Sequence, residues 1–482
     1  MSDRAAIRTV VAEGLTREFP RGVRRDEPIP RLAQRVAVIK GIRRSGKTYR
    51  LFQRANELLS AGVERERILF VDFEDDRLQP LDNRTIARIV EEFLRSSNAD
   101  AESTLYLFFD EVQAVPDWGR TLRRLSQDGR YEIVVSGSSA KMLSDDVDTE
   151  FRGRSIAAEL YPYSFREFLR CHGMEPGEGV LSPDDERTFK RAFDDYLTIG
   201  GFPEVQGCDA ATRAVALQGI ARTITARDLS ERHGLPVLGT RFFIQYALRL
   251  SGREFSVNKI YNTLHSMQIP LSKEAANSLP SYCEDAYLFF LVPRFGADFV
   301  EAQRGRRKLY AIDPGLQLAM GSGSSVDRGQ ALETSIYIEL RRRLKGDPLS
   351  RIGFYRTSSG YEVDFVVGDE MEHSPRAAFQ VSADVSDSAT LARETRALSE
   401  ALDEAGLDRG FLIVGDGADD VVVEDERLRV IDAWRWMLGD SDGHTATDKS
   451  SSAVPIDEEL GYAILPSEWD DPEDDCLYDE LV

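Results

Sequence analysis

An eight-residue stretch from Gly41 to Thr48 has the composition of a loop that holds phosphate. It reads Gly-Ile-Arg-Arg-Ser-Gly-Lys-Thr, which matches the Gly-x4-Gly-Lys-Thr pattern of a Walker A motif. Glycines let the backbone wrap close to an anion, and N–H groups at the start of the following helix point at it. Lys47 is predicted to reach the β- and γ-phosphates, and Thr48 to offer its hydroxyl to Mg²⁺. The residues predicted to bind nucleotide are Gly41, Arg43, Arg44, Ser45, Gly46, Lys47 and Thr48.

A second group of residues suited to this chemistry lies further along the chain. The apolar run Leu105-Tyr-Leu-Phe-Phe ends in Asp110-Glu111, and a buried strand followed by two acidic residues is typical of a Walker B motif. Asp110 is predicted to hold Mg²⁺, directly or through water, and Glu111 to polarise the water that attacks the γ-phosphate. The two motifs together predict binding and hydrolysis of ATP.

Polar and basic residues extend the predicted site beyond the acidic pair. A strand at 132–136 leads into Ser-Gly-Ser-Ser, where Ser136 or Ser138 would sense the γ-phosphate; the alternative is a simple turn at a strand end. Arg152 and Arg154 follow in Phe-Arg-Gly-Arg. Either arginine would act as an arginine finger, which stabilises charge on the phosphate of a nucleotide bound to the same subunit or to a neighbouring one. The alternative is a surface ion pair.

These motifs need a scaffold that brings the ends of several strands together. Short apolar runs alternate with segments of helical period in the first part of the chain, with expected strands at 36–39, 68–73, 104–109 and 132–136. Such alternation predicts a parallel, doubly wound α/β sheet. Helical periods then dominate residues 163–300, including one helix expected over 211–230 and another over 273–290. After residue 306 strands and helices mix again, with strands expected at 306–312, 352–367 and 377–381.

Composition restricts the classes of partner and compartment. The 482-residue chain has a net charge of −22, which argues against a globally basic nucleic-acid binder but leaves a local basic groove open. Residues 440–482 hold 14 Asp or Glu and one Lys, so they read as a disordered tail or as a short motif that docks on a basic groove. Four scattered cysteines favour the cytoplasm, and the short apolar runs predict no membrane contact.

The order of the motifs resembles that of a known protein family. Beside the two Walker motifs stand SGSSAKML, FRGRS, LYPYSFREFL, YLTIGGFPEV and YEVDFVV, in this order. They are similar to the prokaryotic AAA-type ATPases that carry a C-terminal DUF4143 domain. The resemblance covers residues 30–438 and implies a P-loop NTPase sheet, then a helical segment with a winged-helix-like module, then a small restriction-endonuclease-like α/β domain.

The predicted domain organisation follows from these motifs and the resemblance. It comprises an N-terminal helix and connector (1–30), an AAA-type domain (31–170), a helical segment (171–305), a DUF4143 domain (306–439) and the acidic tail (440–482). Residues 255–264, followed by a helix from Lys273, have helix-turn-helix spacing. This pair of helices either contacts DNA or is a helical hairpin used for packing.

The C-terminal unit also invites comparison with metal-dependent nucleases. Such nucleases need a helix Glu, a strand Asp, and then Glu or Gln two residues before a Lys on the next strand. Glu333 and the segment Glu362-Val-Asp364 match the first two elements, but the third reads Gln380-Val-Ser382. Because the lysine is missing from this place, nuclease activity is not expected.

Three functions therefore remain open. The first is an ATPase that uses ATP and Mg²⁺ to rearrange its C-terminal domains on a DNA or protein partner. The second is a slow nucleotide-gated assembly switch, and the third, less favoured, is a Mg²⁺-dependent nuclease. A finger arginine that acts across subunits would require a homo-oligomer.

Overall fold

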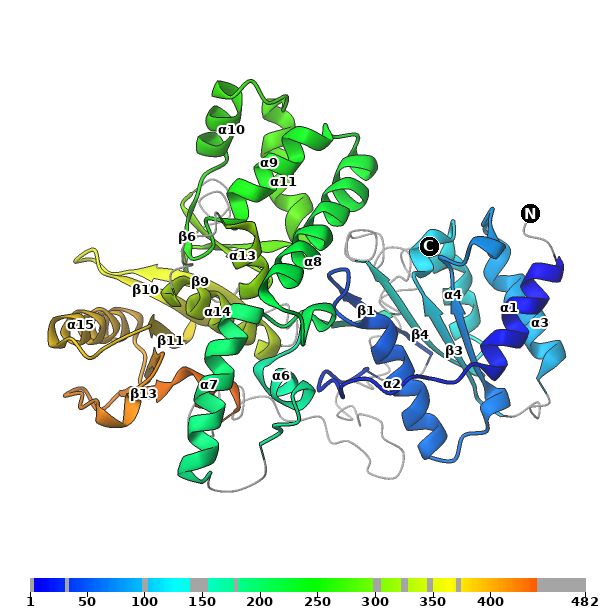
Figure 1. Ribbon diagram of the computed structural model, residues 1–482, viewed down its shortest axis with the longest axis horizontal. Coiled ribbons are helices and arrows are strands. Elements are labelled where there is room, and N and C mark those ends of the chain that lie inside the picture. The colour runs from blue at the N-terminus through cyan, green and yellow to red at the C-terminus, as the bar shows by residue number, and fades with distance from the viewer. Residues whose placement is uncertain are drawn as a thin grey trace, which may run out of the picture.

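The structure is a computed structural model, and its strands form three sheets. It describes residues 4–30, 34–97, 103–138, 155–176, 181–297, 305–321, 328–344, 350–369 and 374–439. Figure 1 shows the N-terminal sheet on the right, the C-terminal sheet on the left, and a group of helices rising at the top of the view. Arg152, Arg154 and the acidic tail 440–482 lie outside the described residues.

The first sheet is fully parallel, with the strand order β2-β3-β4-β1-β5. Its strands are β1 (Val36–Gly41), β2 (Ile68–Asp72), β3 (Leu105–Asp110), β4 (Tyr131–Ser138) and β5 (Ser155–Glu159). Its helices are α1 (Arg4–Thr16), α2 (Lys47–Ser60), α3 (Thr85–Ser96) and α4 (Trp118–Ser126). The expected P-loop NTPase sheet is confirmed. The sequence missed β5, because this strand lies at an edge and its Ser-Ile-Ala-Ala-Glu stretch has no long apolar run.

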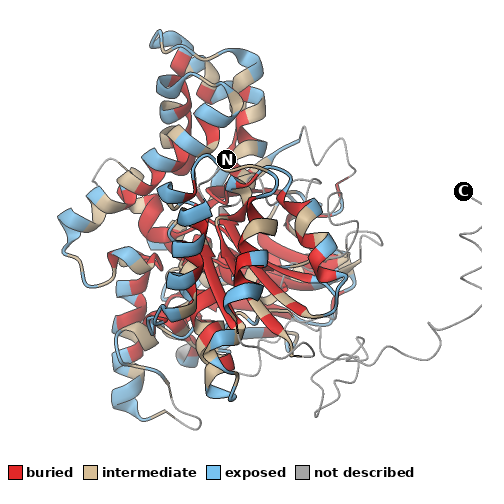
Figure 2. Ribbon diagram, turned by 90° about the vertical axis from the view of Figure 1, so that its right-hand side faces the viewer, coloured by how far each residue is buried: buried red, intermediate tan, exposed pale blue. Residues whose placement is uncertain are grey.

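Alternate residues of each strand enter two cores on opposite faces of this sheet. Val38 packs in the core that contains α1, α3 and α4, whereas its neighbour Ile39 packs against α2. A strand buried on both faces needs a nearly continuous apolar sequence, which is the pattern seen in β1 to β4. Figure 2 shows these strands as the buried centre of the domain. The N-terminal helix belongs to this core, since Ile7, Val10 and Val11 of α1 are buried there.

Helices dominate the middle of the chain. They are α6 (Phe165–Cys171), α7 (Pro183–Ile199), α8 (Ala210–Thr223), the π-helical segment η6 (Ile224–Glu231), α9 (Val237–Leu248), α10 (Val257–Ser266) and α11 (Lys273–Asp285). The expected single helix over 211–230 thus changes from α to π at residue 224. The expected helix over 273–290 was wrong at its end: Tyr287 has a φ of 53°, and the chain enters a strand.

Three short strands complete a winged-helix-like unit with α9, α10 and α11. They are β6 (Arg253–Phe255), β7 (Phe289–Pro293) and β8 (Arg307–Ala311), in the antiparallel order β6-β8-β7. The sequence analysis assigned residues 306–312 to the C-terminal unit, whereas the hydrogen bonds of β8 join it to this sheet. Sequence position did not reveal that, because β8 pairs with β6 across more than 50 residues.

The last sheet is mixed and has the order β13-β12-β11-β10-β9. Its strands are β9 (Ser350–Arg356), β10 (Glu362–Asp369), β11 (Pro375–Ser382), β12 (Gly410–Val414) and β13 (Leu428–Asp432). Strands β9 to β11 are antiparallel and β11 to β13 are parallel. Helix α14 (Arg328–Leu344) precedes β9, and α15 (Ser388–Ala405) connects β11 to β12. The expected small α/β domain is thus present, although the strand expected over 352–367 divides at Gly360 into β9 and β10.

The middle and C-terminal parts share one hydrophobic core. That core runs from Phe165 and Phe193 through Tyr310 to Phe365 and Trp436, so side chains from all these elements bury one another. The residue Phe295, just after β7, is buried against the C-terminal sheet and its N–H bonds to the carbonyl of Phe354 at 2.8 Å. Within the described residues, no helix is both long and apolar enough to cross a membrane.

Candidate nucleotide site

The loop between β1 and α2 has a backbone that two glycines make possible. Gly46 has a φ of 98° and immediately precedes α2, so a side chain there would be strained. Gly41 lies so close to β5 that an added Cβ would stand 2.1 Å from the carbonyl oxygen of Leu160. The two glycines of the motif thus fit the loop against its neighbours and start the helix whose N–H groups face an anion.

The side chains of this loop fit a bound phosphate. Lys47 is buried, and its Nζ donates to the carbonyls of Gly41 and Ile42, each at 3.0 Å. Burial lowers the pKa of Lys47 because it disfavours the charged ammonium. The negative charges of Glu111 and Asp110 act in the opposite direction and favour the ammonium. The Oγ of Ser45 is buried and has no hydrogen-bond partner within the described part of the chain. An anion at the loop would supply partners for both groups.

Asp110 joins the loop to the strand ends beside it. Its Oδ2 accepts a hydrogen bond from Thr48 Oγ1 at 2.6 Å, and its Oδ1 accepts one from Ser136. The sheet order explains this contact, because β4, which carries Ser136, lies between β1 and β3. Burial raises the pKa of Asp110 to about 6, although both hydroxyls favour the carboxylate. A hydroxyl and a carboxylate held this closely are a suitable ligand pair for Mg²⁺.

Glu111 lies at a strained turn after β3. Its φ of 50° is uncommon for a residue with a side chain, and such conformations gather at functional sites. Gln113 donates a hydrogen bond to its carboxylate. Glu111 therefore lines the site from the turn after β3.

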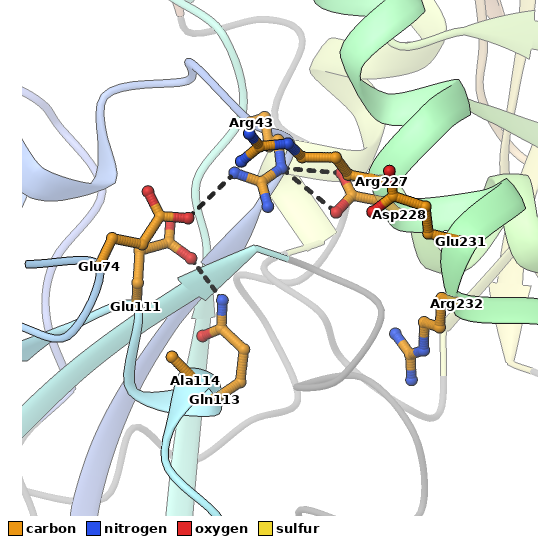
Figure 3. A pocket seen from close by; sticks show the side chains of 9 residues that line it. All are labelled: Arg43, Glu74, Glu111, Gln113, Ala114, Arg227, Asp228, Glu231 and Arg232. Atoms are coloured by element: carbon orange, nitrogen blue, oxygen red, sulfur yellow. Dashed lines mark hydrogen bonds and ion pairs between the residues drawn. The ribbon is translucent and has the colours of Figure 1, made fainter. Parts of the chain in front are cut away.

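A pocket of about 500 Å³ opens beside Glu111 and spans two parts of the molecule. The first sheet and its loops contribute one wall, and η6 with the residue after it contributes the other (Figure 3). The lining residues are Arg43, Glu74, Glu111, Gln113, Ala114, Arg227, Asp228, Glu231 and Arg232. The nucleotide loop thus faces the helical segment across a polar, charged pocket.

Arg43 connects the two walls of this pocket. Its Nε lies 2.9 and 3.2 Å from the two carboxylate oxygens of Asp228, and its Nη1 lies 3.6 Å from Glu74 (Figure 3). The neighbouring Arg44 instead turns outward, is mostly exposed, and pairs with Glu204 at 3.5 Å. Of the two predicted loop arginines, only Arg43 therefore presents its side chain to the pocket.

Two contributors to the site were not found from the sequence. Arg25, in the N-terminal connector, donates to the carbonyls of Ser45 at 2.7 Å and Tyr161 at 2.6 Å. Arg25 also pairs with the buried Glu167 at 2.9 Å. The other contributor is Asp228, which lies 185 residues from Arg43. No motif spacing reveals contacts over such separations. The one available signal was the adjacent charged residues Arg227 and Asp228 within a helical segment, which indicate that one of them has an ionic partner.

Three consecutive segments of the chain match the models of known domain families. Residues 33–169 match an AAA domain family, AAA_14; residues 190–327 and 328–436 match two domains of unknown function, DUF8612 and DUF4143. An uncharacterized protein of Methanocaldococcus jannaschii is 28% identical over 424 residues, which is 86% of this chain and 91% of the relative. One from Haemophilus influenzae is 28% identical over 312 residues, covering 64% of this chain and 74% of that relative.

Among solved structures, a Walker-type ATPase of Pyrococcus abyssi is similar with 14% identity and a TM-score of 0.34. The alignment covers 66% of this chain and 96% of that one. The parallel sheet, the loop after β1 and the acidic end of β3 agree with the match to the AAA family. Residues 33–169, which carry the P-loop sheet, thus match an AAA domain, and residues 328–436 match a DUF4143 domain.

Proposed function

We propose that this protein binds ATP with Mg²⁺ and hydrolyses it to ADP and phosphate. The observation that carries the proposal is the 2.6 Å contact between Thr48 Oγ1 and Asp110 Oδ2 beside the loop that starts α2. Thr48 and Asp110 would hold the metal ion, which supplies positive charge to the phosphates. Lys47 adds a second positive charge within the same loop.

Each remaining residue of the site has a role that follows from its position. Ser136 orients Asp110 through its hydrogen bond and would respond to the γ-phosphate. Glu111, lining the pocket, polarises the attacking water. Arg152 or Arg154 would stabilise charge on the phosphate as a finger, in its own subunit or in a neighbour of a homo-oligomer.

The ion pairs of Arg43 support a link between nucleotide state and the helical segment. A γ-phosphate is a stronger partner for a guanidinium than one carboxylate, because it has more charge and more acceptor oxygens. ATP at the loop would therefore draw Arg43 away from Asp228 and Glu74. Loss of the Asp228 contact would free η6 to move relative to the first sheet, and π-helical turns often occur at functional sites.

The same link also favours the second candidate, a slow nucleotide-gated assembly switch. The rate of ATP hydrolysis distinguishes the two functions. The class of partner, DNA or protein, would depend on the chemistry of the surface that moves. On α11, the exposed positions Lys273, Glu274, Asn277 and Ser281 carry no net positive charge, so a protein partner is the better fit to this helix.

Steady-state release of phosphate tests the proposed hydrolysis. We expect Glu111→Gln to reduce turnover by about 10²- to 10⁴-fold while a fluorescent ATP analogue still binds, because a base is lost but the loop is intact. Glu91→Gln, on an exposed face of α3, is the matched control and should leave turnover unchanged.

One result would distinguish the two candidate functions, and two others would contradict the assigned role of Glu111 or the whole proposal. Wild-type turnover that stays below about 0.01 per second, with DNA, RNA and lysate fractions added in turn, would support the slow switch over an ATPase that rearranges its C-terminal domains. Equal turnover in the wild type and Glu111→Gln would contradict the assigned role of Glu111. Equal binding of the analogue to the wild type and Lys47→Ala would overturn the proposal.

A further inference from the structure

A buried lysine lies at the centre of the acidic group in the C-terminal domain. The Nζ of Lys308, on β8, is 2.9 Å from Asp364, 3.0 Å from Glu362 and 3.2 Å from Glu333. Its side chain is 8% exposed. The three carboxylates come from α14 and β10, so Lys308 reaches them from a different part of the fold.

These carboxylates occupy the positions at which a metal-dependent nuclease would carry its first two ligands. The remaining position on β11 is held by Gln380, whose Oε1 accepts the N–H of Asp364 at 3.2 Å and whose Nε2 donates to Glu394 at 2.7 Å. The second oxygen of Asp364 accepts the N–H of Val381 at 3.0 Å. Most of the oxygens that would bind a metal ion are thus engaged within the protein.

Further contacts of β8 strengthen the connection. Tyr310, two residues after Lys308, donates its hydroxyl to Glu333 at 2.5 Å. Ser251, just before β6, shares a 2.9 Å hydrogen bond with Thr334, the neighbour of Glu333 on α14. Two further polar contacts therefore join the three-stranded sheet and its neighbouring segment to α14 close to Lys308.

We infer that the ammonium group of Lys308 is the resident cation of this centre, in the place of a divalent metal ion, and that it fastens the winged-helix-like unit to the C-terminal sheet. The lysine missing after Gln380 is thus replaced in space by one from another strand, but with a different role. In this arrangement the acidic group is a structural joint.

A migrated catalytic lysine that works beside a metal ion is the competing explanation. The distances favour the joint, because an ammonium in contact with all three carboxylates leaves a metal ion no position without strong repulsion between the two cations. In the described residues, no group of three or more His, Cys, Asp or Glu side chains is arranged to hold a metal. The two explanations make opposite predictions when Lys308 is removed.

Binding of Mn²⁺ to the nucleotide-free full-length chain tests the inference. Carboxylate sites accept Mn²⁺ readily, and its electron paramagnetic resonance signal reports the bound fraction. We expect Lys308→Ala to gain one site at least tenfold tighter than any in the wild type, and to lose it again in Lys308→Ala/Asp364→Asn. Lys259→Ala, an exposed lysine on α10, is the control and should bind like the wild type.

Measurements on the wild type keep the inference falsifiable even if Lys308→Ala does not fold. We expect wild type and Asp364→Asn to bind Mn²⁺ equally, because Asp364 already has a cation; the nucleotide loop is identical in both and cancels. A wild-type site that disappears in Asp364→Asn would overturn the inference. So would Mg²⁺-dependent cleavage of DNA that both Asp364→Asn and Lys308→Met abolish, since it would identify a migrated catalytic lysine. Failure of Lys308→Ala to gain Mn²⁺ binding would overturn it as well.

Discussion

At the scale of single residues, the nucleotide site depends on Asp110, which receives hydrogen bonds from a loop residue and from a neighbouring strand. Thr48 and Ser136 both donate to its carboxylate, and Asp110, the last residue of β3, is almost fully buried. A buried carboxylate remains ionised only where partners favour its charge, and the raised pKa shows that burial outweighs these two hydroxyls. A metal ion would supply the stabilisation of charge that the protein alone lacks.

Removal of the loop lysine should abolish most nucleotide binding. We expect Lys47→Ala to weaken the affinity for a fluorescent ATP analogue at least tenfold, because the proposed role of this ammonium, now held against the loop carbonyls, is direct contact with the phosphates. Equilibrium titration followed by fluorescence anisotropy measures this change. The exposed Lys259→Ala should retain wild-type affinity, and equal weakening in both variants would show that the effect is not specific to the loop.

The pH dependence of stability should reveal the burial of Asp110 when nucleotide is absent. Its pKa is about 6 in the folded protein and 3.8 ordinarily, so the folded state binds more protons between these values. The contribution of Asp110 to the free energy of unfolding should therefore fall as pH rises from about 4 to about 6, by roughly 3 kcal/mol.

Thermal unfolding at a series of pH values, for wild type and Asp110→Asn, measures this effect. The asparagine variant carries no titrating group at this position, so its midpoint should rise relative to that of the wild type as pH increases from about 4 to about 6. A difference between the two proteins that does not vary with pH would contradict the assigned pKa.

At the scale of elements, η6 and the loop after β1 meet through one ion pair. Arg43 and Asp228 should be energetically coupled, and contacting pairs of this kind typically couple by about 0.5–3 kcal/mol in double-mutant cycles. We expect such coupling between Arg43→Ala and Asp228→Asn in nucleotide-free protein, measured by chemical unfolding. The coupling should become smaller when a non-hydrolysable ATP analogue is bound, because the phosphate then competes for Arg43.

A matched cycle on an exposed pair gives the reference. Arg306 and Glu254 form a 3.1 Å surface contact far from the loop, and their coupling should be small and independent of nucleotide. If the Arg43–Asp228 coupling does not change with the analogue, this ion pair is a fixed structural contact and the proposed link fails.

Elements also show what sequence patterns could and could not predict. The alternation of buried strands and helices was sufficient for the parallel sheet, and the ends of parallel strands necessarily meet at one edge, which brings Thr48, Asp110 and Ser136 together. Strand β8 was assigned to the wrong neighbours, because its apolar residues suit either sheet and only long-range pairing with β6 decides. Lys308 was not noticed for the same reason: its three partners lie 25 to 56 residues away.

At the scale of the whole molecule, the chain is organised around contacts between its parts. Arg43 and Asp228 join the first sheet to the helices, and Lys308 joins the winged-helix-like unit to the last sheet. These contacts connect the loop after β1 to the C-terminal domain through η6 and the shared core. Apart from the placement of β8, the domain boundaries predicted from the sequence stay predictions.

Mixing of variant subunits tests whether assembly contributes to catalysis. If Arg154 acts on the nucleotide of a neighbour, mixed Glu111→Gln and Arg154→Ala subunits should recover part of the wild-type turnover. At some interfaces an intact Glu111 from one variant then faces an intact Arg154 from the other. Phosphate release at a constant total concentration measures the recovery. Activity that equals the average of the two separate variants at every mixing ratio would argue for an arginine acting in its own subunit, or for none.

The connector before β1 has a practical consequence for fragments of this protein. Arg25 bonds the loop carbonyl of Ser45 and also reaches Tyr161 and Glu167, so it is a strap across the base of the nucleotide loop. The matched AAA domain begins only at residue 33. A recombinant fragment cut at that boundary would lose the strap together with α1 and expose the apolar surface that Ile7, Val10 and Val11 cover. Biochemical work on the isolated ATPase domain should therefore retain the first thirty residues.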